Sequence, residues 1–248
     1  MPVDGIPFNA PASPERVRGL LERLGVGPGA RVLDVGCGRG EMLRLLAAAT
    51  GCGGLGIDRD ADEVARARET ARAQDLGEAL SFEAASFDEA VANGRVTGPF
   101  DAALCVGATQ AFGPPGEALR GALEGLRPLV RAGGRLLVGE GVWQRDPPDA
   151  YLAATGMGRD DFGAADGLAP AAAATGWRLA HHEASSSEEW DVFEGAFLAG
   201  AEAAAEAAPE DADALARRDH WRGWNAAYRR WGRDTLGFVF AVLERGAD

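Results

Sequence analysis

Val32-Leu-Asp-Val-Gly-Cys-Gly-Arg-Gly40 joins a short apolar run to a segment with helical periodicity, and this stretch decides the fold. The apolar run, residues 31–35, has the length and composition of a buried strand, and residues 41–49 follow as a helix. Three glycines at alternate positions separate the two. Because glycine has no Cβ, the backbone can turn sharply here and approach a ligand closely. A strand, a glycine-rich turn and a helix in this order predict the start of an α/β fold.

The same alternation continues through the first half of the chain. Four further apolar runs have the length of strands: residues 54–58, 80–84, 100–106 and 134–138. Residues 61–75 and 117–130 have the spacing of amphipathic helices. Alternating strands and helices predict a parallel sheet that is covered by helices on both faces.

The second half has a different pattern, with longer helical segments. In chain order we expect a Pro-rich loop, a helix, a strand, two helices and a last strand, at residues 144–149, 160–175, 177–184, 188–208, 211–230 and 236–243. The two helices form an insertion, residues 187–233, that contains Trp190, Trp221, Trp224 and Trp231. These rings either pack the insertion onto the sheet or line an acceptor pocket. The length of the chain suits one core, so we expect a single domain, 1–248.

The chain is acidic, with a formal net charge of −13, and all 25 of its basic residues are arginine. An acidic surface repels phosphate groups, so DNA, RNA and anionic membranes are disfavoured as partners. The absence of lysine excludes Schiff-base chemistry and a P-loop. No apolar run approaches the roughly 20 residues of a membrane span, and the start of the chain lacks the features of a signal peptide. We therefore expect a cytoplasmic protein.

Cysteine and histidine supply few candidates for metal or nucleophilic chemistry. The three cysteines have neither the spacing of a zinc site nor the pattern of a disulfide framework, so we expect no metal. Cys105 lies within a strand and is assigned to the core. His181 and His182 also lie within a strand. His220 lies on the insertion near two tryptophans, and it is a candidate for a catalytic or pocket residue.

An acidic residue about twenty positions beyond the glycines completes a nucleoside-binding pattern. Asp58 ends the second strand, where a carboxylate accepts hydrogen bonds from ribose hydroxyls. Dinucleotide-binding folds favour G-x-G-x-x-G, whereas Gly36, Gly38 and Gly40 have the spacing G-x-G-x-G. Asp34 lies just before them, and its charge would repel a pyrophosphate but suits an ammonium group. The pattern favours S-adenosylmethionine, which has an ammonium, a sulfonium and a ribose but no phosphate, over NAD.

Four segments resemble motifs of the class I S-adenosylmethionine-dependent methyltransferases: residues 32–40, 56–60, 100–107 and 129–138. The resemblance extends over residues 14–140. It implies S-adenosylmethionine as the cofactor and a Rossmann-like, doubly wound α/β sheet of seven strands. The sheet is expected to be mostly parallel, with an antiparallel last strand and the helical insertion before that strand.

Other segments resemble, more loosely, a subset of uncharacterised bacterial small-molecule methyltransferase-like proteins in this family. These segments are Asn9-Ala-Pro11, Gly107-Ala-Thr109, Gly139-Glu-Gly-Val-Trp143, Glu189-Trp-Asp191 and Trp231-Gly-Arg-Asp-Thr-Leu-Gly237. The proline-rich N-terminal segment, residues 1–14, is expected to be either a lid over the cofactor, with Phe8 and Asn9 nearest to it, or a tail.

The resemblance implies a set of cofactor-binding residues on and after the first four strands. They are Asp34, Gly36, Cys37, Gly38, Gly40, Asp58, Arg59, Ser86, Phe87, Val106 and Gly107. One position departs from the family. Many members have an aspartate after the third strand that binds the adenine amino group, whereas this chain has Ser86, whose hydroxyl can still accept a hydrogen bond. Phe87 is expected to cover the adenine face.

The residues that act on the methyl acceptor are harder to identify than those that bind the cofactor. A sulfonium methyl group is electrophilic without help, so the protein has mainly to align the acceptor and exclude water. Glu140 follows strand five and is expected to be an acceptor-binding carboxylate or general base, or else a structural acid. Thr109, Trp143 and Tyr151 are expected to bind the acceptor, with core packing as the alternative for the two aromatic residues.

The sequence favours a small molecule as the acceptor. No Asn-Pro-Pro-Tyr-type run, which grips a flipped nucleic-acid base, follows strand four, and the negative charge points the same way. One alternative is a cofactor-binding protein of this fold that transfers no methyl group or has a repurposed reaction such as a cyclisation. Another is an NAD-dependent oxidoreductase. The pattern names neither the acceptor nor the oligomeric state.

Overall fold

The computed structural model describes residues 8–246, which form two compact units. The sheet unit comprises Pro14–Glu140, Asp166–Glu183 and residues 239–246. The helical unit comprises residues 8–13, Gly141–Ala165 and Ala184–Phe238. Half of the expected lid or tail, residues 1–7, lies outside the described residues. The expectation of a single domain stays a prediction.

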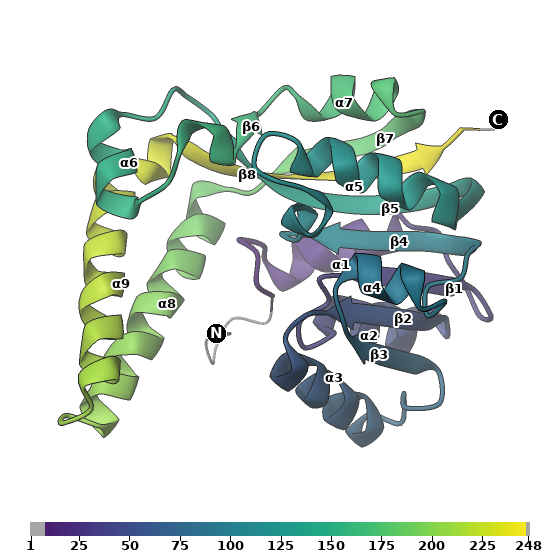
Figure 1. The fold of residues 1–248 in the computed structure, drawn as a ribbon, viewed down its shortest axis with the longest axis horizontal. Helices are drawn as coiled ribbons and strands as arrows, with labels where there is room; N and C mark the ends of the chain where they lie inside the picture. The colour runs from purple at the N-terminus through teal and green to yellow at the C-terminus, as the bar shows by residue number, and fades with distance from the viewer. Residues whose placement is uncertain (1–7, 247–248) are drawn as a thin grey trace. The chain divides into compact units, whose positions relative to one another are not determined.

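Seven strands within residues 8–246 form a sheet in the order β3-β2-β1-β4-β5-β8-β7 (Figure 1). Their bounds are β1 Arg31–Val35, β2 Gly53–Asp58, β3 Leu80–Ala84, β4 Phe100–Val106, β5 Val130–Trp143, β7 Trp177–Ala184 and β8 Leu236–Arg245. The pairs β1–β2, β2–β3, β1–β4 and β4–β5 are parallel, whereas β8 runs opposite to β4 (Figure 1). A two-residue strand, β6 Gly163–Ala164, pairs with the end of β5. The predicted doubly wound, mostly parallel sheet with an antiparallel last strand is confirmed.

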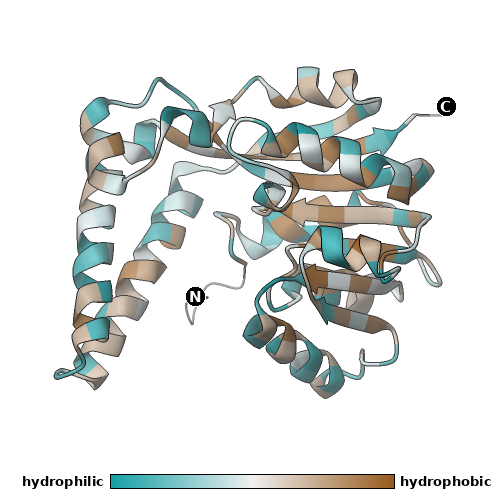
Figure 2. Ribbon diagram, viewed as in Figure 1, coloured by the Kyte–Doolittle hydropathy of each residue, from teal (hydrophilic) through white to brown (hydrophobic). Residues whose placement is uncertain are grey.

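The central strands are buried along most of their length. Nearly every residue of β1, β4 and β8 is buried, as is typical of strands that are covered on both faces. Figure 2 shows the apolar colour concentrated on β4 and β5. β7 is one of the two edge strands of this order, and its residues after Trp177 are exposed or half-buried. His181 and His182 therefore occupy a partly solvated strand.

The helices of the sheet unit follow the strands after short turns. Their bounds are α1 Pro14–Glu22, α2 Glu41–Thr50, α3 Ala61–Ala73, α4 Phe87–Ala92, α5 Ala118–Leu126 and α7 Leu168–Ala174, with 3-10 turns η1 Thr109–Phe112 and η2 Arg127–Leu129. Local side chains set the helix starts. Asp60 accepts two backbone N–H groups at the start of α3, and Ser86 and Glu89 form a capping box at the start of α4. Because the first five strands are parallel, the loops that follow them meet at one edge of the sheet.

The helical unit contains α6 Asp149–Thr155, η3 Arg159–Asp161, α8 Ser187–Ala207, α9 Ala212–Arg230 and η4 Gly232–Asp234. α8 and α9 lie side by side (Figure 1) and pack against each other. They confirm the two helices predicted at residues 188–208 and 211–230. Among the described helices, none combines the length and the apolar character needed to cross a bilayer.

The predicted helix at residues 160–175 is wrong in its first half. That stretch contains η3, the short strand β6 and only then α7. Gly163 and Gly167 weaken the helix there, and Gly163 pairs with Val142 of β5 instead. α7 begins at Leu168, and its Pro170 is tolerated because it lies in the first turn.

Candidate functional site

The glycine-rich loop between β1 and α2 adopts a left-handed backbone at all three of its glycines. The φ angles are +73° at Gly36, +52° at Gly38 and +71° at Gly40. A Cβ at Gly36 would lie 2.1 Å from the Cβ of Ala108, and one at Gly40 would lie 2.5 Å from the ring of Phe82. A Cβ at Gly38 would meet no described atom within 4 Å. Packing within the protein therefore explains why Gly36 and Gly40 have no side chain, whereas Gly38 faces open space.

Asp58 ties this loop to the end of β2. Its Oδ2 accepts the backbone N–H of Gly38 at 2.8 Å, and its Oδ1 accepts that of Asp60 at 2.9 Å. The N–H groups of Gly36 and Cys37 donate to the carbonyl of Ile57 in the same region. The predicted pair of loop and acidic residue is thus in direct contact, and the assignment of the half-buried Asp58 to ribose binding stays a prediction.

Asp34 is a buried carboxylate without a hydrogen-bond partner among the described residues. It is 5% exposed and lies within β1 between Gly56 of β2 and Leu104 of β4. Burial, together with the charges of Asp58 and Glu41, raises the pKa of Asp34 to about 7. A buried acid is costly unless a cation or a donor joins it. An ammonium group bound at the loop would supply both, so the residues present fit a ligand of that kind.

We expect Asp34→Asn to make the protein more stable at about pH 8. The pKa of Asp34 in the folded state lies above the ordinary value of 3.8 for an aspartate, so ionisation of this group opposes folding. That penalty is absent below about pH 4, grows as the pH rises towards 7 and is complete above it. Differential scanning calorimetry should show a Tm several degrees higher than the wild type at about pH 8, with a difference that shrinks towards about pH 4. A Tm that is lower at both pH values would contradict this assignment.

The residues predicted to surround an adenine already have local roles. Ser86 Oγ donates to Glu89 Oε2 at 2.8 Å and accepts the N–H of Glu89 at 3.3 Å. Phe87 is buried, and its ring packs at 4.5 Å from that of Phe112. Arg59 is exposed, and burial raises the pKa of the Cys37 thiol. The assignment of these residues to cofactor binding stays a prediction.

The end of β4 and the adjoining part of β5 bring two of the predicted acceptor residues together, and Glu140 lies within β5 and not after it as predicted, because the strand continues to Trp143. Val106 is in register with Gly139, and Gly107 donates its N–H to the carbonyl of Gly139 at 2.8 Å. This pairing places Thr109 beside Glu140, and Thr109 Oγ1 donates a hydrogen bond to Glu140 Oε2. Burial raises the pKa of Glu140 to about 7, and the hydrogen bond from Thr109 opposes that shift. A carboxyl group with this pKa can hold or release a proton near neutral pH.

The remaining predicted site residues belong to the helical unit. Trp143 donates its indole N–H to the carbonyl of Arg159 at 2.8 Å, and its ring contacts Tyr151 and Phe162 edge-on. Tyr151 is fully buried. His220 is exposed and packs against two tryptophan rings of α9. The roles of these three residues in binding or catalysis stay predictions. Within the described residues, no three His, Cys, Asp or Glu side chains are placed to hold a metal ion.

Two residues that shape the site were absent from the predicted set. Ala108 leaves just enough room for Gly36, and the ring of Phe82 fills the space beside Gly40 and Gly56. The signal that could have identified Ala108 was its small side chain in the loop between Gly107 and Thr109. No local pattern identifies Phe82, because its contact depends on how β3 pairs with β2.

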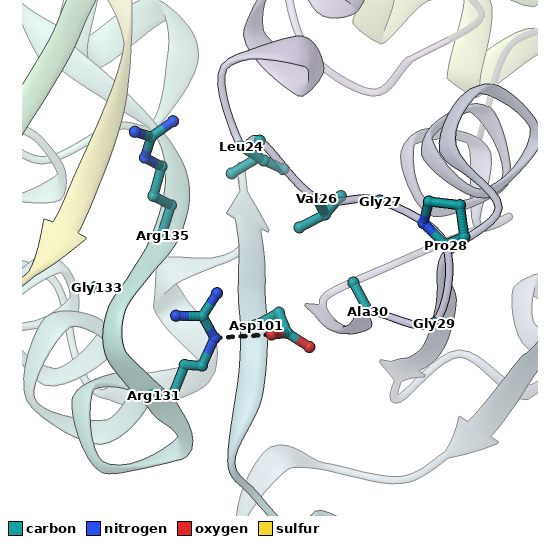
Figure 3. A pocket seen from close by; sticks show the side chains of 11 residues that line it. Leu24, Val26, Gly27, Pro28, Gly29, Ala30, Asp101, Arg131, Gly133 and Arg135 are labelled. Atoms are coloured by element: carbon teal, nitrogen blue, oxygen red, sulfur yellow. Dashed lines mark hydrogen bonds and ion pairs between the residues drawn. The ribbon is translucent and has the colours of Figure 1, made fainter.

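A hollow of the sheet unit lies at the amino-terminal ends of β1, β4 and β5 (Figure 3). It has a volume of about 490 Å³ and is lined by residues 24–30 together with Asp101, Arg131, Gly133 and Arg135. Arg131 Nε donates to Asp101 Oδ1 at 2.7 Å, and Arg135 donates to the carbonyl of Arg23 at 2.6 Å. The charged groups here already serve the fold. Ligands of such sheets bind at the carboxyl ends of the strands, where the glycine loop, Asp58 and Glu140 are found.

Comparison with known proteins identifies close relatives. A family described as "Methyltransferase domain" matches residues 27–170. The chain is 32% identical over 241 residues to the uncharacterized protein YjhP of Escherichia coli K12, covering 95% of this chain and 93% of the relative. Two solved structures, described as S-adenosylmethionine-dependent methyltransferases in complex with S-adenosyl-L-homocysteine, are each 27% identical and cover 96% of this chain and 94% of the other. They come from Geobacter sulfurreducens, with a TM-score of 0.82, and from Thiobacillus denitrificans, with a TM-score of 0.83.

Proposed function

The chain belongs to the class I S-adenosylmethionine-dependent methyltransferases, and on that premise we propose that it methylates a small molecule. The observation that carries this proposal is the pair of groups at the carboxyl edge of the sheet. One is a glycine loop with open space at Gly38 next to the partner-free carboxylate of Asp34. The other is the half-buried carboxyl group of Glu140, which accepts a hydrogen bond from Thr109 and whose pKa is raised by burial to about 7.

The cofactor half of the site fits S-adenosylmethionine. The backbone at Gly38 and the carboxylate of Asp34 would hold its amino-acid part, and Asp58 would hold its ribose hydroxyls. The sulfonium of the bound cofactor supplies an electrophilic methyl group. The chain contributes alignment and a backbone that is already in place, because Asp58 holds the N–H of Gly38.

Glu140 serves the acceptor half of the site. In its ionised form it accepts the proton that an acceptor hydroxyl loses as its oxygen becomes methylated, or the proton that an ammonium group must lose before its nitrogen has a free electron pair to attack the methyl group. Thr109 Oγ1 holds Glu140 Oε2 in place, which leaves Oε1 to take up that proton. Burial raises the pKa of Glu140 and the hydrogen bond from Thr109 lowers it, and the resulting pKa of about 7 suits a general base near neutral pH.

Two features support a small acceptor over a nucleic acid. The net charge of −13 opposes the approach of a phosphate backbone. Gly107, Ala108 and Thr109 follow β4, and these small side chains offer no stacking surface for an extruded base.

Asp58→Ala tests the placement of the ribose. We expect this substitution to weaken the binding of S-adenosyl-L-homocysteine by about 10- to 100-fold, because hydrogen bonds to a charged group contribute about 1–3 kcal/mol. Titration calorimetry with S-adenosyl-L-homocysteine and with NAD measures the effect and the choice of cofactor. The matched control is Asp60→Ala, which removes the cap of α3 at a cost of about 1 kcal/mol in stability and should leave the affinity unchanged.

A screen of metabolites for methyl transfer completes the test. Transfer to a small molecule, together with tight binding of S-adenosyl-L-homocysteine, is the expected result. Tight cofactor binding without transfer to any metabolite class would instead favour a protein of this fold with another reaction. Preferential binding of NAD would overturn the placement of the cofactor.

A further inference from the structure

The helical unit contains three buried polar atoms that have no hydrogen-bond partner in the part of the chain that the structure describes. They are Oε2 of Glu194, Nε1 of Trp190 and the hydroxyl of Tyr151. These side chains are 3%, 7% and 0% exposed, respectively. Buried polar groups are nearly always paired. Three unpaired groups in one small unit therefore indicate a missing partner.

The three side chains belong to one cluster. Trp190 and Glu194 lie one turn apart on the same face of α8, and the ring of Trp190 stacks on that of Tyr228 from α9, with centroids 6.2 Å apart. Burial, and then the charge of Glu194, raises the pKa of Tyr151. The carboxylate also raises the pKa of Tyr228. A Cβ at Gly232 would meet both the hydroxyl of Tyr151 and the ring of Tyr228, so the two phenols lie beside one backbone position.

The protein supplies Glu194 with a donor but with no cation. Trp224 Nε1 donates to Glu194 Oε1 at 3.2 Å. The nearby arginines are engaged elsewhere, Arg229 with Asn225 at 2.8 Å and Arg233 with Asp191 at 2.9 Å. Among the described residues, no arginine lies within ion-pair distance of Glu194. Burial raises the pKa of Glu194 to about 7, because the described residues offer no cation to compensate the ionised form.

The chemistry of the cluster defines what would complete it. A cationic donor at Oε2 would stabilise the ionised form of Glu194, and the faces of Trp190 and Tyr228 attract cations as well. Trp190 Nε1 is only a donor, so it requires an acceptor atom on the same ligand. A water molecule can reach such atoms but brings no positive charge. The net charge of −13 favours the approach of a cation from solution.

We propose that Glu194, Trp190 and Tyr151 bind an amine that also carries a hydroxyl or carbonyl oxygen. The ammonium group pairs with Glu194 Oε2 and Tyr151, and the oxygen accepts the N–H of Trp190. The site lies within the helical unit and does not depend on the proposed function.

A pair of matched probes tests the proposal. Phenylethanolamine carries an ammonium, a hydroxyl and a ring, and phenylethanediol replaces the ammonium by a neutral hydroxyl. Tryptophan fluorescence and calorimetry on the full chain, with and without S-adenosyl-L-homocysteine, give the affinities. We expect the amine to bind at least about tenfold more tightly than the diol, as a charge-assisted hydrogen bond requires. Equal affinities, or no saturable binding of the amine, overturn the proposal.

Glu194→Gln separates recognition of charge from packing. The substitution keeps the shape of the side chain and an oxygen for Trp224, and we expect it to remove the preference for the amine. Because the pKa of Glu194 is raised from 4.5 to about 7, its ionisation opposes folding above that pH. The variant should therefore have a Tm at about pH 8 no lower than that of the wild type. A folded variant that still prefers the amine contradicts the proposal.

Glu206→Gln is the control, since Glu206 is exposed on the same helix and the substitution changes the net charge equally. It should leave the preference for the amine unchanged. Binding of S-adenosyl-L-homocysteine is measured on the same samples. If the wild type binds S-adenosyl-L-homocysteine but not the amine, this site alone is refuted. If the wild type does not bind S-adenosyl-L-homocysteine, the proposed function is refuted.

Discussion

Gly38→Ala is expected to weaken the binding of S-adenosyl-L-homocysteine by at least about 100-fold, or about 2.7 kcal/mol, while the protein stays folded. A Cβ at this position meets no described atom within 4 Å, so in the free protein the substitution costs only the strain of a left-handed backbone, about 1–2 kcal/mol. In the complex, the added methyl group occupies the space that the ligand needs. Titration calorimetry measures the affinity, and thermal unfolding measures the strain.

Gly94→Ala is the matched control for this prediction. Gly94 follows α4 with a φ angle of +67°, and a Cβ there also meets nothing within 4 Å. The two variants should lose similar stability, but only Gly38→Ala should lose affinity. Equal affinities in both would show that the open space at Gly38 is not the ligand site. Gly36 and Gly40 are less informative, since a Cβ at either collides with the protein itself.

The strands were predictable because each is a compact apolar run with a polar or glycine boundary. The predicted bounds of β1, β3, β4 and β7 agree with the structure to the residue. β5 was predicted too short, at residues 134–138, because its pairing begins at Val130 across an irregularity beside β4 and continues to Trp143. Pairing of this kind depends on the neighbouring strand and leaves no periodic signal along the chain.

Three helices were not predicted, although two of them have local signals. Val17, Leu20 and Leu21 have helical spacing and are buried in α1. Ser86 and Glu89 have the spacing of the capping box that starts α4. α6 begins at Asp149 directly after two prolines, and only seven residues form it. Proline-rich flanks conceal such short helices because they resemble a continuous loop.

The site was predictable where it depends on topology and unpredictable where it depends on side-chain partners. Parallel strands bring Asp58 to the glycine loop and Thr109 to Glu140, as the order of strands and loops implies. The bond between Ser86 and Glu89 and the unpaired Oε2 of Glu194 depend on rotamers and on neighbours from other elements. No spacing along the chain encodes them.

Glu140→Gln is expected to lower kcat by about 10²- to 10⁴-fold, the usual contribution of a general base, with the affinity for S-adenosyl-L-homocysteine nearly unchanged. The acceptor identified by the metabolite screen serves as the substrate. In the wild type, kcat/KM should rise with pH through about 7, because Glu140 acts as a base only after it has lost its proton. In the variant that inflection should disappear.

Thr109→Val gives a second readout that does not require turnover. The hydrogen bond from Thr109 lowers the pKa of Glu140, so its removal should move the titration of Glu140 to higher pH. Carbon-13 NMR of the glutamate carboxyl groups follows this shift directly, and the inflection in kcat/KM should move with it. Glu124→Gln, which removes an exposed carboxylate on α5, should change neither quantity. A Glu140→Gln variant with wild-type turnover and an intact inflection would exclude Glu140 as the base, because the remaining carboxamide cannot take up the proton.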